Sequence, residues 1–191
     1  MKTTTSALLV SALTFIPTLA HAHPGHGAGF AAGAAHPLMG LDHLLAMLAV
    51  GLWAAQLGGR ARWMVPAAFV AVMSVASVLG MQGVAVPMVE SVILCSVVIL
   101  GLLIATMARL PLAASVALVG VFAAFHGLAH GMEVPANASG VTYTAGFALA
   151  TAALHGAGLA LAAVLQRGAA MGWVRVAGAA VAIAGAMLAV S

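Results

Sequence analysis

The sequence predicts an all-α fold, a bundle of helices that crosses a membrane. Apolar residues make up 64% of the 191 residues and charged residues only 5%, with a mean hydropathy of +1.20. A soluble domain needs far more charge to cover its surface. The apolar residues also gather in segments long enough to cross a bilayer, which takes about 20 residues each. These observations together indicate an integral membrane protein.

The first 22 residues are typical of a secretory signal peptide. Lys2 precedes an apolar stretch over residues 7–20, and Ala20-His21-Ala22 has the small-x-small pattern of a cleavage site. An uncleaved anchor helix is the alternative, and the short apolar stretch argues against it. Both versions place the chain outside the cytoplasmic membrane at residue 23, so residues 23–191 are predicted to form one transmembrane domain.

Six later segments are each long and apolar enough to be membrane spans. Breaks rich in Gly, Pro or Arg separate them, and such short connections predict antiparallel neighbours in a compact bundle. Two halves of three helices would then be inverted relative to each other, as in many transporters, although the sequence shows no repeat between the halves. The segments are residues 38–57, 63–81, 87–107, 111–131, 142–165 and 171–190.

The basic residues predict the orientation in the membrane. With residue 23 outside, the first, third and fifth loops lie in the cytoplasm and contain Arg60, Arg62, Arg109 and Arg167, whereas the outer loops contain no Lys or Arg. This asymmetry is the one expected of a bacterial inner-membrane protein, here with both mature ends in the periplasm. Only six basic residues are present, and they form no patch that would hold a nucleic acid.

The fourth segment ends in the chain's densest cluster of ionisable residues, Phe125-His126-Gly127-Leu128-Ala129-His130-Gly131-Met132-Glu133. Ionisable groups inside a membrane are costly and usually mark an ion or substrate path. At about 100° per residue, His126, His130 and Glu133 fall on one helix face. Neighbouring histidines can share a metal ion, with the glutamate as a third ligand or as a group that orients an imidazole. The alternative is two interfacial histidines beside a solvated glutamate.

The first segment begins with a second cluster, His36-Pro37-Leu38-Met39-Gly40-Leu41-Asp42-His43. If Pro37 begins the helix, His36, His43 and Met47 share a face. Asp42 could hold an imidazole of a neighbouring helix or bind a metal directly. As an alternative, its carboxylate caps the free amides at the start of the helix.

Other candidates rest on weaker grounds. His155, in the fifth segment, is either a packing residue or part of the same path. Glu90, at the outer start of the third segment, is a possible metal-capture residue, or it is there because the helix dipole alone favours a carboxylate. His23 and His26 would lie near the processed N-terminus and could form a flexible metal-capture site. Alternatively, two histidines occur there by chance in a polar tail. The single cysteine, Cys95, cannot form an internal disulfide.

The spacing His36-x5-Asp42-His43 together with Phe125-His126-Gly127-x-Ala129-His130-Gly131-x-Glu133 resembles the HupE/UreJ family over the whole mature chain. The resemblance implies a secondary permease for nickel or cobalt, associated with the metallochaperones of hydrogenase or urease maturation. It implies that the His, Asp and Glu positions of both motifs are functional. Nickel rather than cobalt comes from the resemblance alone, because ligand type does not separate the two metals.

We therefore expect a non-enzymatic permease that imports a divalent transition metal, Ni²⁺ before Co²⁺, as its substrate and holds no permanently bound cofactor. The sequence has neither the nucleotide-binding pattern Gly-x4-Gly-Lys-Ser/Thr nor the His-Glu-x-x-His of many metalloproteases. The alternatives are a membrane metal buffer or sensor that does not conduct, and a di-histidine haem electron carrier. The sequence leaves homo-oligomerisation open.

Overall fold

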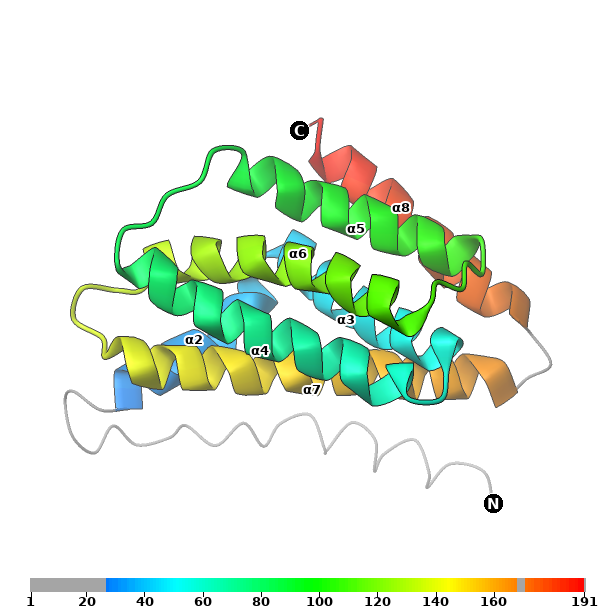
Figure 1. The fold of residues 1–191 in the computed structure, drawn as a ribbon, viewed down its shortest axis with the longest axis horizontal. Helices are drawn as coiled ribbons and strands as arrows, with labels where there is room; N and C mark the ends of the chain where they lie inside the picture. Colours follow the sequence, from blue (N-terminus) through cyan, green and yellow to red (C-terminus); the bar gives the residue numbers. More distant parts are fainter. Residues whose placement is uncertain (1–26, 168–170, 191) are drawn as a thin grey trace, which may run out of the picture.

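The computed structural model describes residues 27–167 and 171–190, and throughout this part of the chain every regular element is a helix (Figure 1). This confirms the predicted all-α class. The predicted signal peptide, with His23 and His26, lies outside the described residues. The helices are α2 (Gly27–Met39), α3 (Leu41–Leu57), α4 (Ala61–Met81), α5 (Val89–Ala105), α6 (Leu112–Met132), α7 (Gly140–Arg167) and α8 (Met171–Leu188).

The helices from α3 to α8 run alternately in opposite directions along the long axis of the molecule (Figure 1). By length and composition α4, α6 and α7 are each able to cross a membrane, and α2 with α3 would make a fourth, bent span. Helices α5 and α8 are apolar but shorter. From the second segment onward, each predicted segment coincides with a helix to within two residues at either end.

The start of the first span differs from the prediction. The chain is already helical from Gly27, Pro37 lies inside α2, and α3 begins only at Leu41. Between the two helices Gly40 is extended, and the axes are bent by 84°. The prediction that Pro37 begins the helix, with His36 and His43 on one face, is therefore wrong. Residues 27–39 are helical because they pack against α7, a tertiary stabilisation that local composition does not reveal.

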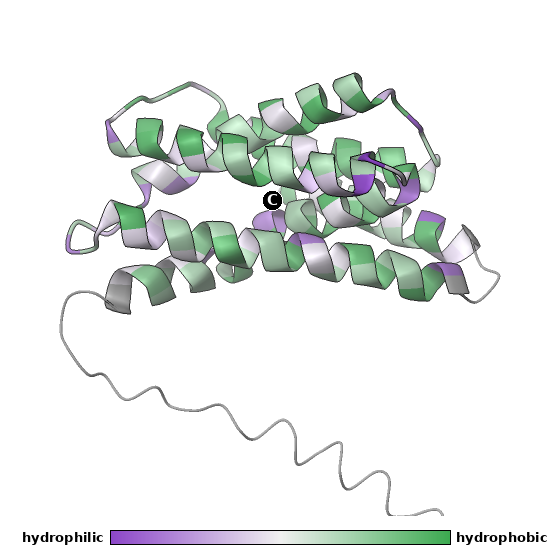
Figure 2. Cartoon of the chain, turned by 60° about the horizontal axis from the view of Figure 1, so that its bottom comes forward, coloured by the Kyte–Doolittle hydropathy of each residue, from purple (hydrophilic) through white to green (hydrophobic). Residues whose placement is uncertain are grey.

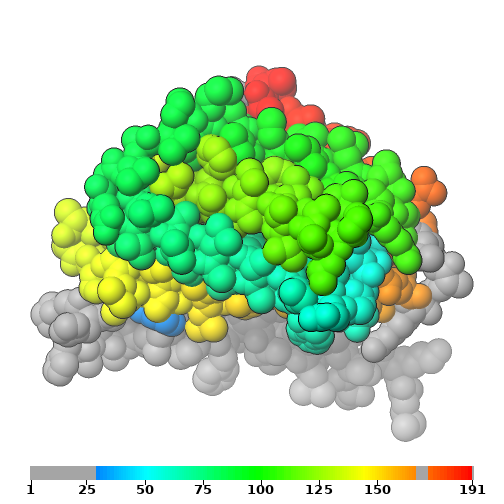
Figure 3. All heavy atoms as spheres, in the orientation of Figure 1, coloured from blue at the N-terminus to red at the C-terminus, as the bar shows by residue number. Residues whose placement is uncertain are grey.

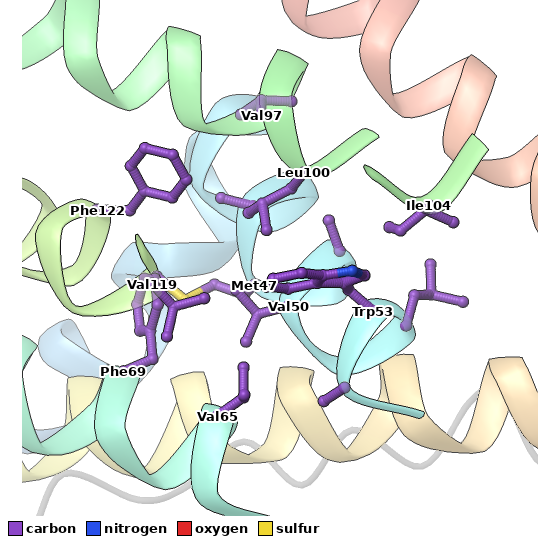
Figure 4. Close-up of a cluster of buried hydrophobic side chains, with 14 of the residues drawn as sticks. Met47, Val50, Trp53, Val65, Phe69, Val97, Leu100, Ile104, Val119 and Phe122 are labelled. Carbon is purple, nitrogen blue, oxygen red and sulfur yellow. The ribbon is translucent and has the colours of Figure 1, made fainter. Parts of the chain in front are cut away.

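Helix α3 forms the centre of the bundle. Its residues are buried almost continuously from Ala46 to Ala54, as expected of a helix that is apolar on all sides. Figure 4 shows Met47, Val50 and Trp53 of α3 surrounded by side chains from three other helices. The surrounding residues labelled there are Val65 and Phe69 of α4, Val97, Leu100 and Ile104 of α5, and Val119 and Phe122 of α6.

Helices α4 and α6 lie side by side on one face of the molecule (Figure 3). Gly127 and Gly131 of α6 lie against the α4 backbone, where an added Cβ would overlap the carbonyl oxygens of Met73 and Ser77. Small residues at this spacing allow helix backbones to approach closely in membranes. The approach brings the histidine-bearing face of α6 into the middle of the bundle.

Most of each helix is coloured as apolar in Figure 2, and the hydrophilic colouring lies mainly towards the helix ends and in the loops. Large apolar side chains such as Leu149, Val164 and Ile183 are exposed, which is typical of a protein that contacts lipid. The arginines lie at the end of the bundle where α3 and α5 finish, and Arg175 Nε donates a hydrogen bond to the Ala105 carbonyl there. The motif histidines of α6 lie towards the opposite end.

Candidate metal centre

The last turns of α6 bring two histidines into the bundle interior. His126 and His130 are one turn apart and fully buried, and Glu133 follows directly after the last helical residue. The His36 ring centroid of α2 lies 4.6 Å from that of His130, and the His43 ring centroid of α3 lies 4.3 Å from it. His130 of α6 therefore contacts residues of both α2 and α3.

His36, His130 and Glu133 form a compact set of potential ligands, which we call the end group. One ligand atom of each lies within 4.8 Å of the other two. His36 Nε2 is 2.9 Å from Glu133 Oε2, and His130 Nδ1 is 3.6 Å from the same oxygen. The Glu133 side chain is half-exposed whereas His130 is buried. Two imidazoles and a carboxylate at this separation suit a late first-row divalent cation.

His43 connects the end group to the interior. Its ring lies between those of His130 and His126, 4.3 Å and 5.2 Å away. Asp42 Oδ1 lies 2.9 Å from His43 Nδ1 and also accepts a hydrogen bond from the His43 backbone N–H. A carboxylate at one ring nitrogen fixes the orientation and leaves the other nitrogen free to bind a metal. That nitrogen, His43 Nε2, is buried without a hydrogen-bond partner.

This geometry modifies two of the three roles that the sequence suggested for Asp42, the cap of the helix and the partner of an imidazole. The residue that caps α3 is Gly40, and Asp42 lies inside the first turn. The imidazole that Asp42 holds belongs to its own neighbour in the chain, not to another helix. Its carboxylate nevertheless satisfies one amide of the helix start, so support of the helix and orientation of the ring are combined in one side chain.

His126 and His155 form what we call the inner pair. Both are buried, and each Nδ1 is within hydrogen-bond distance of a backbone carbonyl, that of Phe122 for His126 and that of Met47 for His155. A carbonyl only accepts, so Nδ1 carries the proton and Nε2 keeps its lone pair. Both Nε2 atoms are buried without a partner. Buried polar atoms are nearly always satisfied, so these nitrogens are suited to an incoming ligand.

Phe69 of α4 separates the members of the inner pair. Its ring centroid lies 5.4 Å from that of His126 and 5.1 Å from that of His155. Sequence reasoning did not single out Phe69, because a buried aromatic residue in an apolar span carries no signal of its own. Phe147 of α7, 3.9 Å from His130, was missed for the same reason.

The remaining candidates stand apart from this row of histidines. Glu90 is exposed in the first turn of α5, and no hydrogen bond or ion pair is found for it within the described residues. Its proposed capture role remains a prediction. The row itself comprises His36, His130, His43, His126 and His155 in spatial order, with Asp42 and Glu133 beside it.

Comparison with known proteins identifies relatives over almost the entire chain. The sequence profile of the family described as "HupE / UreJ protein" matches residues 10–188. "Protein HupE" of Rhizobium leguminosarum bv. viciae is 49% identical over 189 residues, which cover 98% of this chain and 96% of that protein. No solved structure matches. The extent of the family match and the identity to a full-length relative show that this chain, a helical membrane protein, belongs to the HupE / UreJ family.

Proposed function

We propose that this protein is a permease that imports a divalent transition metal, Ni²⁺ before Co²⁺, from the periplasm into the cytoplasm. The observation that carries the proposal is the convergence of His36, His130 and Glu133 at one end of a row of imidazoles that continues through His43 to His126 and, across the Phe69 ring, to His155. A metal site alone would need only the end group. The further ring nitrogens without partners, deeper in the bundle, provide the next positions for a moving ion.

The proposed topology has six spans. Helices α2 and α3 together make the first, and α4 to α8 make the others, with the short α5 and α8 at the lower limit of about 17 residues for a membrane helix. The described arginines lie at the end opposite the end group, so the positive-inside rule directs the end group to the periplasm. The ion would lose part of its hydration shell there, beside the carboxylates of Asp42 and Glu133 that offset its charge.

The metal and its destination come from the family. The relative named HupE and the HupE/UreJ resemblance connect this chain to nickel or cobalt supply for hydrogenase or urease maturation. The proposed partners on the cytoplasmic side are therefore metallochaperones of those enzymes. The metal ion is the substrate, and no permanently bound cofactor is proposed.

Uptake of radioactive nickel into proteoliposomes tests the proposal. The purified protein should raise uptake above that of empty vesicles, with Co²⁺, Zn²⁺ and Cu²⁺ added as competitors. His155→Ala should abolish most uptake while Ni²⁺ binding at the end group persists, because His155 lies beyond Phe69 in the row. Met132→Ala, an exposed neighbour of the α6 motif, is the matched control and should transport normally.

Two results would favour the alternatives. Stoichiometric Ni²⁺ binding without movement into the vesicle lumen would identify a buffer or sensor. A Soret band in the purified protein would identify a di-histidine haem carrier, since paired imidazoles are also haem ligands.

A further inference from the structure

Tyr143 has a buried hydroxyl without a partner among residues 27–167 and 171–190. The residue lies in the first turn of α7 with only 1% of its surface exposed. Its phenol oxygen is buried and makes no hydrogen bond within this described part of the chain. A phenylalanine would fill the same space without burying an unpaired polar atom, which is unfavourable. The hydroxyl is therefore better explained by a hydrogen bond to a bound ligand than by a contribution to folding.

The end group lies beside this tyrosine. The Tyr143 ring centroid is 5.8 Å from that of His36, whose Nε2 lies 2.9 Å from Glu133 Oε2. Helix α2 approaches α7 closely here because residue 33 is glycine, whose added Cβ would overlap the Tyr143 carbonyl. The helix contact that places His36 in the end group thus places Tyr143 next to it.

Phe147, another α7 residue in contact with the end group, has no polar atom with which to bind a hydrated ion. It lies one turn further along the helix and contacts both His36 and His130. The end group supplies two imidazoles and one carboxylate, so a divalent ion held there keeps water on its remaining positions. Water bound to a divalent cation is a strong hydrogen-bond donor, and a neutral phenol oxygen accepts such a bond readily although it is a weak metal ligand.

We infer that Tyr143 is a positioning residue of the end group, whose hydroxyl accepts a hydrogen bond from a water molecule retained on the bound divalent metal ion. The inference rests on the proposed function for the identity of the ion and specifies how that ion is held. The tyrosine binds the partly hydrated ion through its water and leaves the metal itself to His36, His130 and Glu133.

Equilibrium dialysis with Ni²⁺ on the purified full-length protein in detergent tests the inference. Tyr143→Phe should raise the Kd about two- to ten-fold, the range for the loss of one hydrogen bond. The melting temperature of the metal-free variant should stay the same or rise, because an unpaired buried hydroxyl has been removed. Ser96→Ala, which deletes another buried hydroxyl in the middle of α5 and outside the end group, is the matched control and should leave the Kd unchanged.

Two outcomes would overturn the inference. One is an unchanged Kd in Tyr143→Phe. The other is a higher Kd accompanied by a lower melting temperature of the metal-free protein, which would indicate a structural hydroxyl. Failure of the wild-type protein to transport Ni²⁺ that it binds would instead refute the proposed function, and the dialysis comparison would still decide the role of Tyr143.

Discussion

The end group and the inner pair use the same imidazole side chain in two different settings. The end group combines two histidines with a half-exposed carboxylate. The inner pair has no carboxylate of its own, is buried, and is oriented by the backbone carbonyls of Phe122 and Met47. An anionic ligand offsets the charge of a cation that leaves water, whereas neutral nitrogens alone hold it less firmly. Under the proposed function, the first region captures the ion and the second passes it on.

The largest effect is expected within the end group itself. His130→Ala removes a ring that contacts both His36 and His43. Both Ni²⁺ binding and uptake should fall by at least about 100-fold. Removal of a group that only hydrogen-bonds to a metal ligand already lowers metal affinity or activity about 10- to 100-fold, and His130 is a proposed ligand itself. Dialysis and vesicle uptake measure the two quantities, with Met132→Ala as control. Normal transport by His130→Ala would remove the end group from the path.

Asp42→Asn should have the next largest effect. It keeps the size of the side chain but removes the charge that orients the His43 ring, so Ni²⁺ affinity should fall about 10- to 100-fold. The exposed loop variant Asn137→Ala is the control. If Asp42 served only the helix start, Asn would replace it almost without cost, because its side-chain oxygen accepts the same amide hydrogen bond. Both the Ni²⁺ affinity and the thermal stability would then stay unchanged, which dialysis and calorimetry would show.

Phe69→Leu separates the two regions most sharply. The substitution keeps an apolar side chain but loses the ring that packs against both members of the inner pair. Aromatic contacts are worth about 1 kcal/mol, so uptake should fall about five-fold while Ni²⁺ binding at the end group stays the same. Phe122→Leu removes another aromatic ring from the core and controls for a general loss of core packing. An equal loss in binding and uptake would show that the two regions are not distinct.

The smallest effect on Ni²⁺ uptake is expected from a lower external pH. Imidazole must be neutral to bind a metal, and histidine ordinarily titrates near pH 6.5. Initial Ni²⁺ uptake should therefore fall about two-fold when the external pH is lowered from about 7.5 to about 6.5, and further below it. The measurement requires a fixed membrane potential. A rate independent of pH would mean that no histidine of the exposed end limits transport.

Much of the fold could be predicted because the apolar segments are long and their breaks are clear. Helices α4 to α8 follow the predicted ranges closely. Helix α2 was missed because its Gly- and Ala-rich sequence resembles a loop, and only its packing on α7 explains its helical state. The bend at Gly40 was missed with it, since Pro37 more often begins a helix than lies inside one.

The site could be predicted in residue type but only partly in geometry. The periodicity of α6 places His126, His130 and Glu133 on one face, and the structure brings His36 and His43 to that face from two other helices. The carbonyl partners of the inner pair could not be predicted, because every residue has a carbonyl and tertiary packing selects which one is used. Phe69 and Tyr143 likewise look like ordinary core residues in the sequence.

The corner between α2 and α3 has one more consequence. Gly40 has φ −100° and ψ 122°, values open to any residue, so its backbone shape does not require glycine. An added methyl would lie 2.8 Å from Asp42 Oδ1 and 3.1 Å from His43 Nδ1, so a larger residue at position 40 would displace these two side chains. The chain thus bends at a position whose missing side chain leaves room for the Asp42 and His43 side chains. A substitution at position 40 would therefore change the orientation of the His43 imidazole together with the bend between α2 and α3.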